Sequence, residues 1–124
     1  MKVFDGLTVL VVEDDWFVRQ DMVLGLQQEG WIVLEADTGL GALKLLRETN
    51  TIDLLVTDIR LADAMTGWDI AEAVRVLYPQ LLVIYASGAP DNDGRRVPES
   101  IFLSKPVTTR ELLLACHRLL PSER

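Results

Sequence analysis

Short apolar runs alternate with segments of helical periodicity along the chain, and this alternation constrains the fold most. Residues 7–12 form a continuous run of leucine, valine and threonine, and residues 52–57 form a second run that is broken by one aspartate. Such runs are typical of strands buried on both faces of a sheet. Shorter runs at 31–35, 81–85 and 101–103 predict three more strands. Strands that alternate with helices predict an α/β fold, with a parallel sheet and helices on both of its faces.

Helical periodicity fills most of the segments between these strands. It predicts helices over residues 16–29, 39–48 and 68–77, and a last one that begins after the cap residue Thr108. Thr38 is the expected cap of the second helix. The side chains expected to face inward are Val18, Met22, Leu26, Leu40, Leu43, Leu46, Ile70, Val74, Leu77, Leu112, Cys116 and Leu119. Trp16, Trp31 and Trp68 are expected to pack in or beside the core.

The length and composition predict one domain. A chain of 124 residues that is 49% hydrophobic can bury a substantial core. The net charge of -7 argues against a nucleic-acid-binding surface, because phosphate contacts need a basic patch. The single cysteine excludes an internal disulfide. The sequence has neither a signal-peptide pattern nor an apolar stretch of membrane-spanning length, so we expect a cytoplasmic protein.

Polar side chains follow four of the predicted strands at the point where each strand ends. In an open parallel sheet these ends share one edge, and ligands bind there. The side chains are Glu13, Asp14 and Asp15 after the first strand, Asp58 after the third, Ser87 after the fourth and Lys105 after the fifth. The sequence therefore predicts one site at this edge.

The acidic residues at this edge predict a bound divalent cation. By itself, the acidic run that begins at Glu13 is equally consistent with a solvated helix start, which the helix dipole favours. With Asp58 beside it, however, the carboxylates would repel one another and raise each other's pKa. Mg²⁺ removes this repulsion, because it binds carboxylates together with water and phosphate oxygens.

The remaining polar groups fit phosphoryl transfer to a carboxylate. Asp58 is the candidate nucleophile. Lys105 can pair with a carboxylate at rest or with a phosphoryl group after transfer, and Pro106 allows a cis peptide bond after it. Ser87 offers a hydroxyl group. Alone, Lys105 would be interpreted as a surface lysine and Ser87 as a turn residue; together they could neutralise charge on a phosphoryl group.

The sequence resembles the receiver domain of bacterial two-component response regulators. The resemblance rests on residues 9–14, 57–58, 86–88 and 102–106 and extends over residues 7–120. It implies a flavodoxin-like (βα)5 three-layer sandwich with a five-stranded parallel sheet of order 2-1-3-4-5. It also implies that Asp58 is the phosphoacceptor, which receives its phosphoryl group from a phosphohistidine on a sensor histidine kinase or a histidine phosphotransfer protein.

The resemblance also implies a metal site. Asp14 and Asp58 would bind Mg²⁺ directly, Glu13 would complete the acidic pair, and the backbone carbonyl of Arg60 would be the third protein ligand. The segment from Asp58 to Gly67 has one residue more than the usual family pattern.

The same resemblance assigns the residues around the phosphoryl group. Ser87 and Lys105 would contact its oxygens, Ser87 and Phe102 would be the switch residues, and Arg60 and Ala89 would flank the pocket. Because Phe102 has no hydroxyl group, its switching can only be steric. The segment between Ser87 and Lys105 is several residues shorter than usual, so we expect a shortened or irregular fourth helix.

We expect residues 1–124 to be a single receiver domain that signals by protein contact or onward phosphotransfer, with an unknown output protein and a possible homodimer. Two alternatives stay open: a receiver domain cut from a larger hybrid histidine kinase, and a receiver-like docking module that is never phosphorylated. A phosphatase of the haloacid dehalogenase kind would need a second acid two residues after Asp58, where Arg60 stands.

Overall fold

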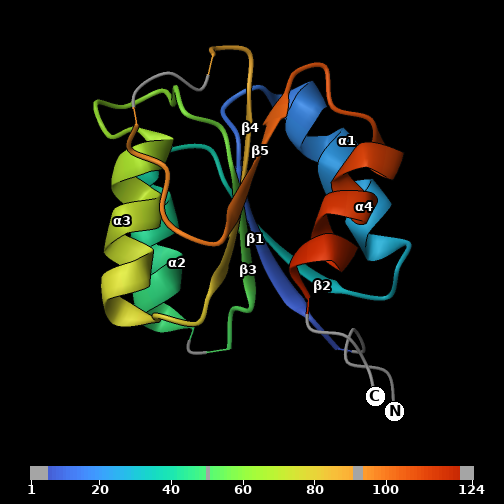
Figure 1. The fold of residues 1–124 in the computed structure, drawn as a ribbon, viewed down its shortest axis with the longest axis horizontal. Coiled ribbons are helices and arrows are strands. Elements are labelled where there is room, and N and C mark those ends of the chain that lie inside the picture. Colours follow the sequence, from blue (N-terminus) through green and yellow to red (C-terminus); the bar gives the residue numbers. More distant parts are fainter. Residues whose placement is uncertain (1–5, 50, 91–93, 121–124) are drawn as a thin grey trace.

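The computed structural model describes residues 6–49, 51–90 and 94–120. Five parallel strands form one sheet in the order β2-β1-β3-β4-β5, which confirms the predicted fold class and strand order. The strands are β1 (Thr8–Val12), β2 (Ile32–Ala36), β3 (Leu54–Thr57), β4 (Leu82–Ser87) and β5 (Ser100–Ser104). Helices α1 (Trp16–Gln27) and α4 (Thr109–Leu119) cover one face of the sheet, and α2 (Gly39–Glu48) and α3 (Gly67–Leu77) cover the other (Figure 1).

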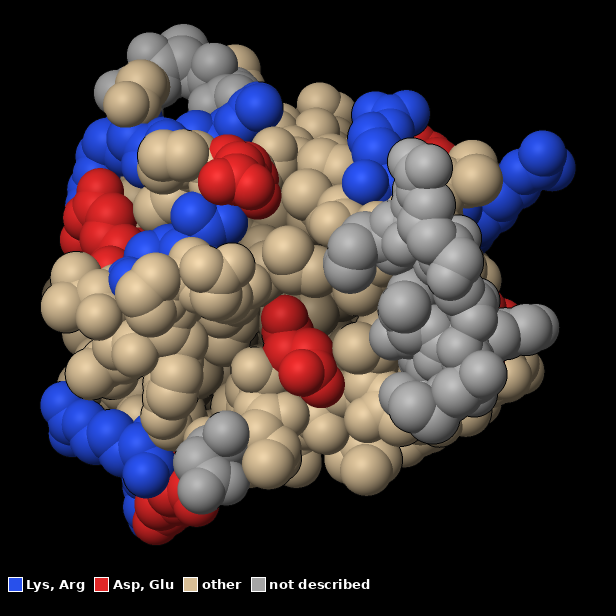
Figure 2. Space-filling model, turned by 60° about the horizontal axis from the view of Figure 1, so that its bottom comes forward, with Lys and Arg blue, Asp and Glu red and all other residues tan. Residues whose placement is uncertain are grey.

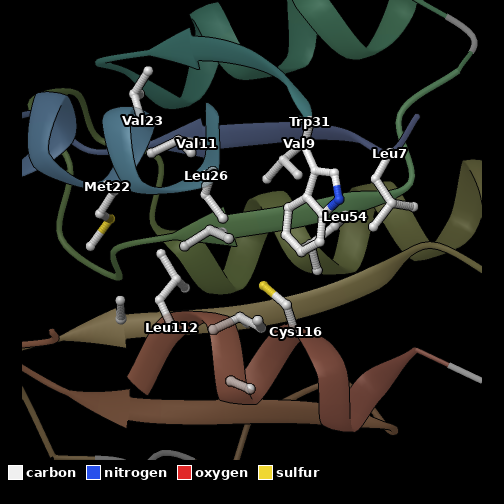
Figure 3. Packing of buried hydrophobic residues seen from close by; sticks show 14 of the residues in the cluster. Leu7, Val9, Val11, Met22, Val23, Leu26, Trp31, Leu54, Leu112 and Cys116 are labelled. Atoms are coloured by element: carbon white, nitrogen blue, oxygen red, sulfur yellow. The ribbon is translucent and has the colours of Figure 1, made fainter. Parts of the chain in front are cut away.

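The two faces of the sheet bury separate hydrophobic clusters. Successive residues of a strand point to opposite faces, so Val9 and Val11 of β1 pack under α1 and α4, whereas Leu10 and Val12 pack under α2 and α3. Figure 3 shows the first cluster, in which Cys116 of α4 lies among side chains of α1 and the central strands. Trp31 and Trp68 are buried, as expected, one in each cluster. Burial raises the pKa of the Cys116 thiol to about 12.

Some side chains predicted to pack inward are instead exposed. Leu40 is 67% exposed, because α2 buries the face that carries Ala42 and Leu46. Two residues along a helix turn about 200°, so Leu40 lies nearly opposite Ala42. Leu77, the last residue of α3, is 55% exposed. The expectation for Trp16 is also wrong: it begins α1 and is 57% exposed.

Between β4 and β5 the described residues contain no helix. The described part of the chain therefore has four helices, rather than the five of a full (βα)5 fold. An irregular segment, residues 94–99, lies beside α3 in this place (Figure 1). Its Arg95 guanidinium bonds to Asp69 and Glu72 of α3, both at 2.8 Å. The backbone N–H of Val97 donates to the hydroxyl of Tyr85 at 3.2 Å. Residues 91–93, which belong to the segment predicted to form a shortened or irregular fourth helix, lie outside the described residues.

Candidate functional site

The carboxyl edge of the sheet brings three acidic residues together. Glu13 follows β1, and Asp58 follows the neighbouring strand β3. One ligating oxygen from each of Glu13, Asp14 and Asp58 lies within 4.8 Å of the others. Asp15, which the sequence placed at the same edge, has a different role: it caps α1 by accepting the N–H of Val18 at 3.1 Å.

Lys105 lies between two of these carboxylates. Its Nζ donates to Oδ2 of Asp58 at 2.8 Å and also to Glu13. The peptide bond between Lys105 and Pro106 is cis. The backbone N–H of Lys105 donates to the carbonyl of Ser87 at 2.9 Å, which joins the ends of β4 and β5 at the site. The ammonium group is therefore held beside the carboxylate of Asp58, the candidate nucleophile.

Burial and pairing shift the pKa values of this cluster. The Glu13 side chain is 2% exposed. This burial raises its pKa, although the hydrogen bond from Lys105 opposes the shift. Burial lowers the pKa of Lys105, but its hydrogen bonds to Asp58 and Glu13 together outweigh that effect and raise it above its usual value. Three carboxylates and one ammonium leave net negative charge when all are ionised. Their oxygen donors therefore suit a hard divalent cation such as Mg²⁺.

A pocket of about 480 Å³ opens beside Asp58. Its lining residues are Asp58, Arg60, Ser87, Gly88, Ala89, Pro90 and Lys105, so Arg60 and Ala89 flank it as predicted. Oδ1 of Asp58 accepts the N–H of Ile59 at 2.6 Å, and Oγ of Ser87 accepts the N–H of Ala89 at 3.2 Å. The pocket thus brings the candidate nucleophile, a hydroxyl and an ammonium group to one concave surface.

The aromatic residue predicted as a switch lies outside this pocket lining. The ring of Phe102 is 6.2 Å from Trp68 and 6.3 Å from Tyr85, measured between centroids. Sequence reasoning did not single out Tyr85, which is fully buried and also accepts the N–H of Val97. Phe102 therefore connects with the segment before β5 through Tyr85.

Sequence reasoning also missed a contact of the loop after Asp58. The carboxylate of Asp63 accepts the N–H of Gly39 and of Leu40, both at 3.0 Å. The only sequence signals are the extra residue in this loop and the absence of an acid in the first turn of α2.

The opposite end of the molecule has a different character. Figure 2 shows the molecule from the side of the amino-terminal ends of the strands. On this face the basic and acidic side chains stand mainly in small mixed groups near the margin, and uncharged atoms cover much of the middle. The acidic cluster with its partly buried lysine lies at the other end, at the carboxyl edge.

Residues 9–117 match the family model of the response regulator receiver domain. The chain belongs to this family. Its structure is similar to that of a response regulator receiver protein from Sinorhizobium medicae WSM419, with a TM-score of 0.87 and 31% identity over 92% of this chain and 94% of that one. It also resembles the receiver domain of the hybrid histidine kinase CckA, with a TM-score of 0.78 and 30% identity over 92% and 99% of the two chains.

Curated relatives include both long and short proteins. The chain is 32% identical to the sensor kinase CckA of Brucella abortus over 94% of its own length, but it spans only 13% of that kinase. It spans about half of a probable transcriptional regulatory protein of Picosynechococcus, at 33% identity over 90% of this chain. It is 30% identical to the receiver protein CpdR of Brucella abortus, over 90% of this chain and 95% of CpdR.

Membership of the family makes this chain a receiver domain of two-component signalling. Receiver domains are signalling domains that interact with histidine kinases or phosphotransfer proteins, and they generally bind Mg²⁺. Among the residues that the structure describes, no helix is long and apolar enough to cross a membrane.

Proposed function

We propose that this receiver domain accepts a phosphoryl group on Asp58 from a phosphohistidine of a sensor histidine kinase or a histidine phosphotransfer protein. The observation that carries the proposal is the position of Lys105, whose Nζ bonds to Asp58 Oδ2 at 2.8 Å at the edge of the polar pocket. In the reaction a carboxylate oxygen of Asp58 forms a bond to phosphorus. The P–N bond breaks, and the imidazole of the donor keeps its electron pair.

The residues around Asp58 are suited to bind the transferred group. Lys105 can exchange its bond to the Asp58 carboxylate for one to a phosphoryl oxygen, which keeps its charge paired. The Ser87 hydroxyl lines the same pocket and can donate to a second oxygen. Because little covalent chemistry is required of the protein, such positioning and charge neutralisation supply most of the catalysis.

Mg²⁺ is the cofactor of this proposal. Asp14 and Asp58 would bind it through carboxylate oxygens, the backbone carbonyl of Arg60 would be the third protein ligand, and Glu13 would complete the acidic group. The convergence of the three carboxylates within 4.8 Å supports this assignment. When bound, the ion neutralises charge on the phosphoryl oxygens.

The output would be a protein contact or an onward phosphotransfer. We propose that Ser87 and Phe102 transmit the state of Asp58. The packing of Phe102 against Tyr85, whose hydroxyl bonds to Val97, supports a response in the segment before β5. The same proposal includes a cytoplasmic location and allows a homodimer.

Phosphorylation by a small phosphodonor tests the proposal. The protein is incubated with acetyl phosphate and Mg²⁺, and its intact mass is measured. We expect one added phosphoryl group, strongly reduced by a chelator and abolished in Asp58→Asn. Asp37→Asn, which changes an exposed acid beyond β2, is the matched control and should be phosphorylated like the wild type.

Two outcomes would contradict the proposal. If the folded wild-type protein takes up no phosphoryl group, the docking-module alternative gains support. If Asp58→Asn is phosphorylated as well as the wild type, the acceptor is another residue.

A further inference from the structure

The loop between β3 and α3 is held at its base by a close backbone contact. The N–H of Gly67 donates to the carbonyl of Ile59 at 2.7 Å. A Cβ atom at Gly67 would lie 2.1 Å from the carbonyl oxygen of Asp58, so only glycine allows this approach. The two ends of the loop are therefore fixed together, whereas the residues between them, including Arg60, need a separate support.

That support comes from the start of α2. Oδ1 of Asp63 accepts the N–H of Gly39, and Oδ2 accepts the N–H of Leu40, both at 3.0 Å. The next N–H of the helix, that of Gly41, bonds to the Thr38 hydroxyl at 3.0 Å. The first N–H groups of a helix have no partner within the helix. Asp63 thus satisfies two of them from a distant part of the chain.

Charge and shape both favour this contact. The first turn of α2 contains no acidic residue of its own, so Asp63 supplies the negative charge that a helix N-terminus attracts. Met65, from the same loop, lies against Gly39, where an added Cβ atom would be 2.6 Å from Met65 Cβ. The loop therefore contacts α2 at two points, and one of them requires a glycine.

We propose that Asp63 is a positioning residue, which holds the β3–α3 loop on α2 so that the backbone of Arg60 is ordered at the acidic site. This inference rests on the proposed function for its reference to Mg²⁺ and phosphoryl transfer. Asp63 itself does not line the pocket, whereas Arg60 does. The loop has one residue more than the usual family pattern, so its backbone has more conformational freedom. That conformational entropy must be lost when the site is ordered. The Asp63 contact removes that freedom before the ion binds.

The first test measures loop order without metal. Amide hydrogen exchange of a peptide covering residues 59–65 is compared in the wild type, Asp63→Asn and Asp63→Ala. We expect faster exchange in both variants, with the larger increase in Asp63→Ala, since asparagine keeps one acceptor oxygen. Thr38→Ala is the matched control, because it removes a cap at the same end of α2 but no contact to the loop. It should leave exchange in residues 59–65 unchanged.

The second test measures Mg²⁺ affinity by calorimetry on the same proteins. Loss of residues that orient metal ligands usually weakens binding about 10- to 100-fold. We expect about a tenfold loss in Asp63→Ala, a smaller loss in Asp63→Asn and none in Thr38→Ala. Gly39→Ala should imitate Asp63→Ala by pushing Met65 away. Gly41→Ala is its control. The added Cβ atom at Gly41 has its nearest contact with Thr38, at 3.1 Å, and not with Met65.

The outcomes separate this inference from the proposed function. If wild-type protein binds Mg²⁺ and is phosphorylated, but folded Asp63 variants match it in exchange and affinity, the positioning role is refuted and the phosphoacceptor remains. Equal losses in Thr38→Ala and Asp63→Ala would also refute it, because they would indicate general loosening of α2. Should Asp63→Ala not fold, Asp63→Asn decides the question alone. Wild-type protein that neither binds Mg²⁺ nor accepts phosphate would refute both.

Discussion

Replacement of Lys105 by methionine tests whether this lysine neutralises the acidic cluster. The change keeps most of the side-chain volume and removes the ammonium group that bonds to Asp58 and Glu13. The Glu13 and Asp58 side chains are only 2% and 11% exposed, so water compensates poorly for the loss. We therefore expect the variant to fold with reduced stability when Mg²⁺ is absent.

The geometry sets the size of the effect. The ligating carboxylate oxygens lie within 4.8 Å of one another. At this upper limit and an effective dielectric constant of about 20, two carboxylates repel by about 3.5 kcal/mol. Removal of one partner from a buried ion pair costs about 3 to 5 kcal/mol. The Lys105 side chain is 22% exposed, and solvent screens part of its interaction. We expect the free energy of unfolding to fall by about 2 to 3 kcal/mol near neutral pH.

The loss should depend on pH. Glu13 already has a pKa above its usual value of 4.5 in the folded protein, and removal of Lys105 removes the hydrogen bond that opposes this rise. An acid whose pKa is higher in the folded state makes the fold less stable as pH increases from the unfolded value through the folded one. The difference between Lys105→Met and wild type should therefore be smallest near pH 5 and should grow toward pH 8.

Urea unfolding followed by tryptophan fluorescence measures these values, because Trp31 and Trp68 are buried in the folded protein. Mg²⁺ should restore at least half of the lost stability, since it replaces the missing positive charge and binds only the folded site. Lys44→Met makes the same change in net charge at an exposed position of α2 and is the control. A loss in Lys105→Met that is independent of pH and Mg²⁺ would refute the role of Lys105 in neutralising the cluster.

Two further predictions concern the surroundings of the site. Tyr85→Phe removes the buried hydroxyl that accepts the Val97 N–H. We expect the free energy of unfolding, measured in urea, to fall by about 1 to 2 kcal/mol, and amide exchange in residues 94–99 to become faster. Unchanged exchange there would contradict a link between Tyr85 and this segment. Gly67→Ala forces a methyl group against the Asp58 carbonyl. We expect the free energy of unfolding to fall by about 1 to 3 kcal/mol, and calorimetry to show weaker Mg²⁺ binding. Wild-type values for both would show that the loop can relax freely.

The sequence was sufficient for the fold class and for the convergence of the acidic residues at one edge of the sheet. Hydrophobic periodicity is a local property, so it revealed the strands and most of the helical faces. The strand ends then had to meet at one edge because the strands are parallel. That argument placed Asp58 beside the acids after β1, and the structure has them within 4.8 Å. Periodicity failed for Leu40, which lies on the face of α2 opposite the buried Ala42, and for Leu77, the last residue of α3.

Only the tertiary structure decided which polar groups pair. Lys105 bonds to Glu13 across 92 positions of the chain, and Asp63 caps a helix that begins 24 positions earlier. Composition predicted a shortened or irregular fourth helix, but it did not reveal that Arg95 and the Tyr85 hydroxyl would hold this irregular segment. Such contacts depend on the distance between atoms of remote segments, whereas periodicity records only neighbours along the chain. The sequence by itself therefore determined which residues reach the carboxyl edge. The packing of the layers determined which of those residues pair and how burial and pairing shift their pKa values.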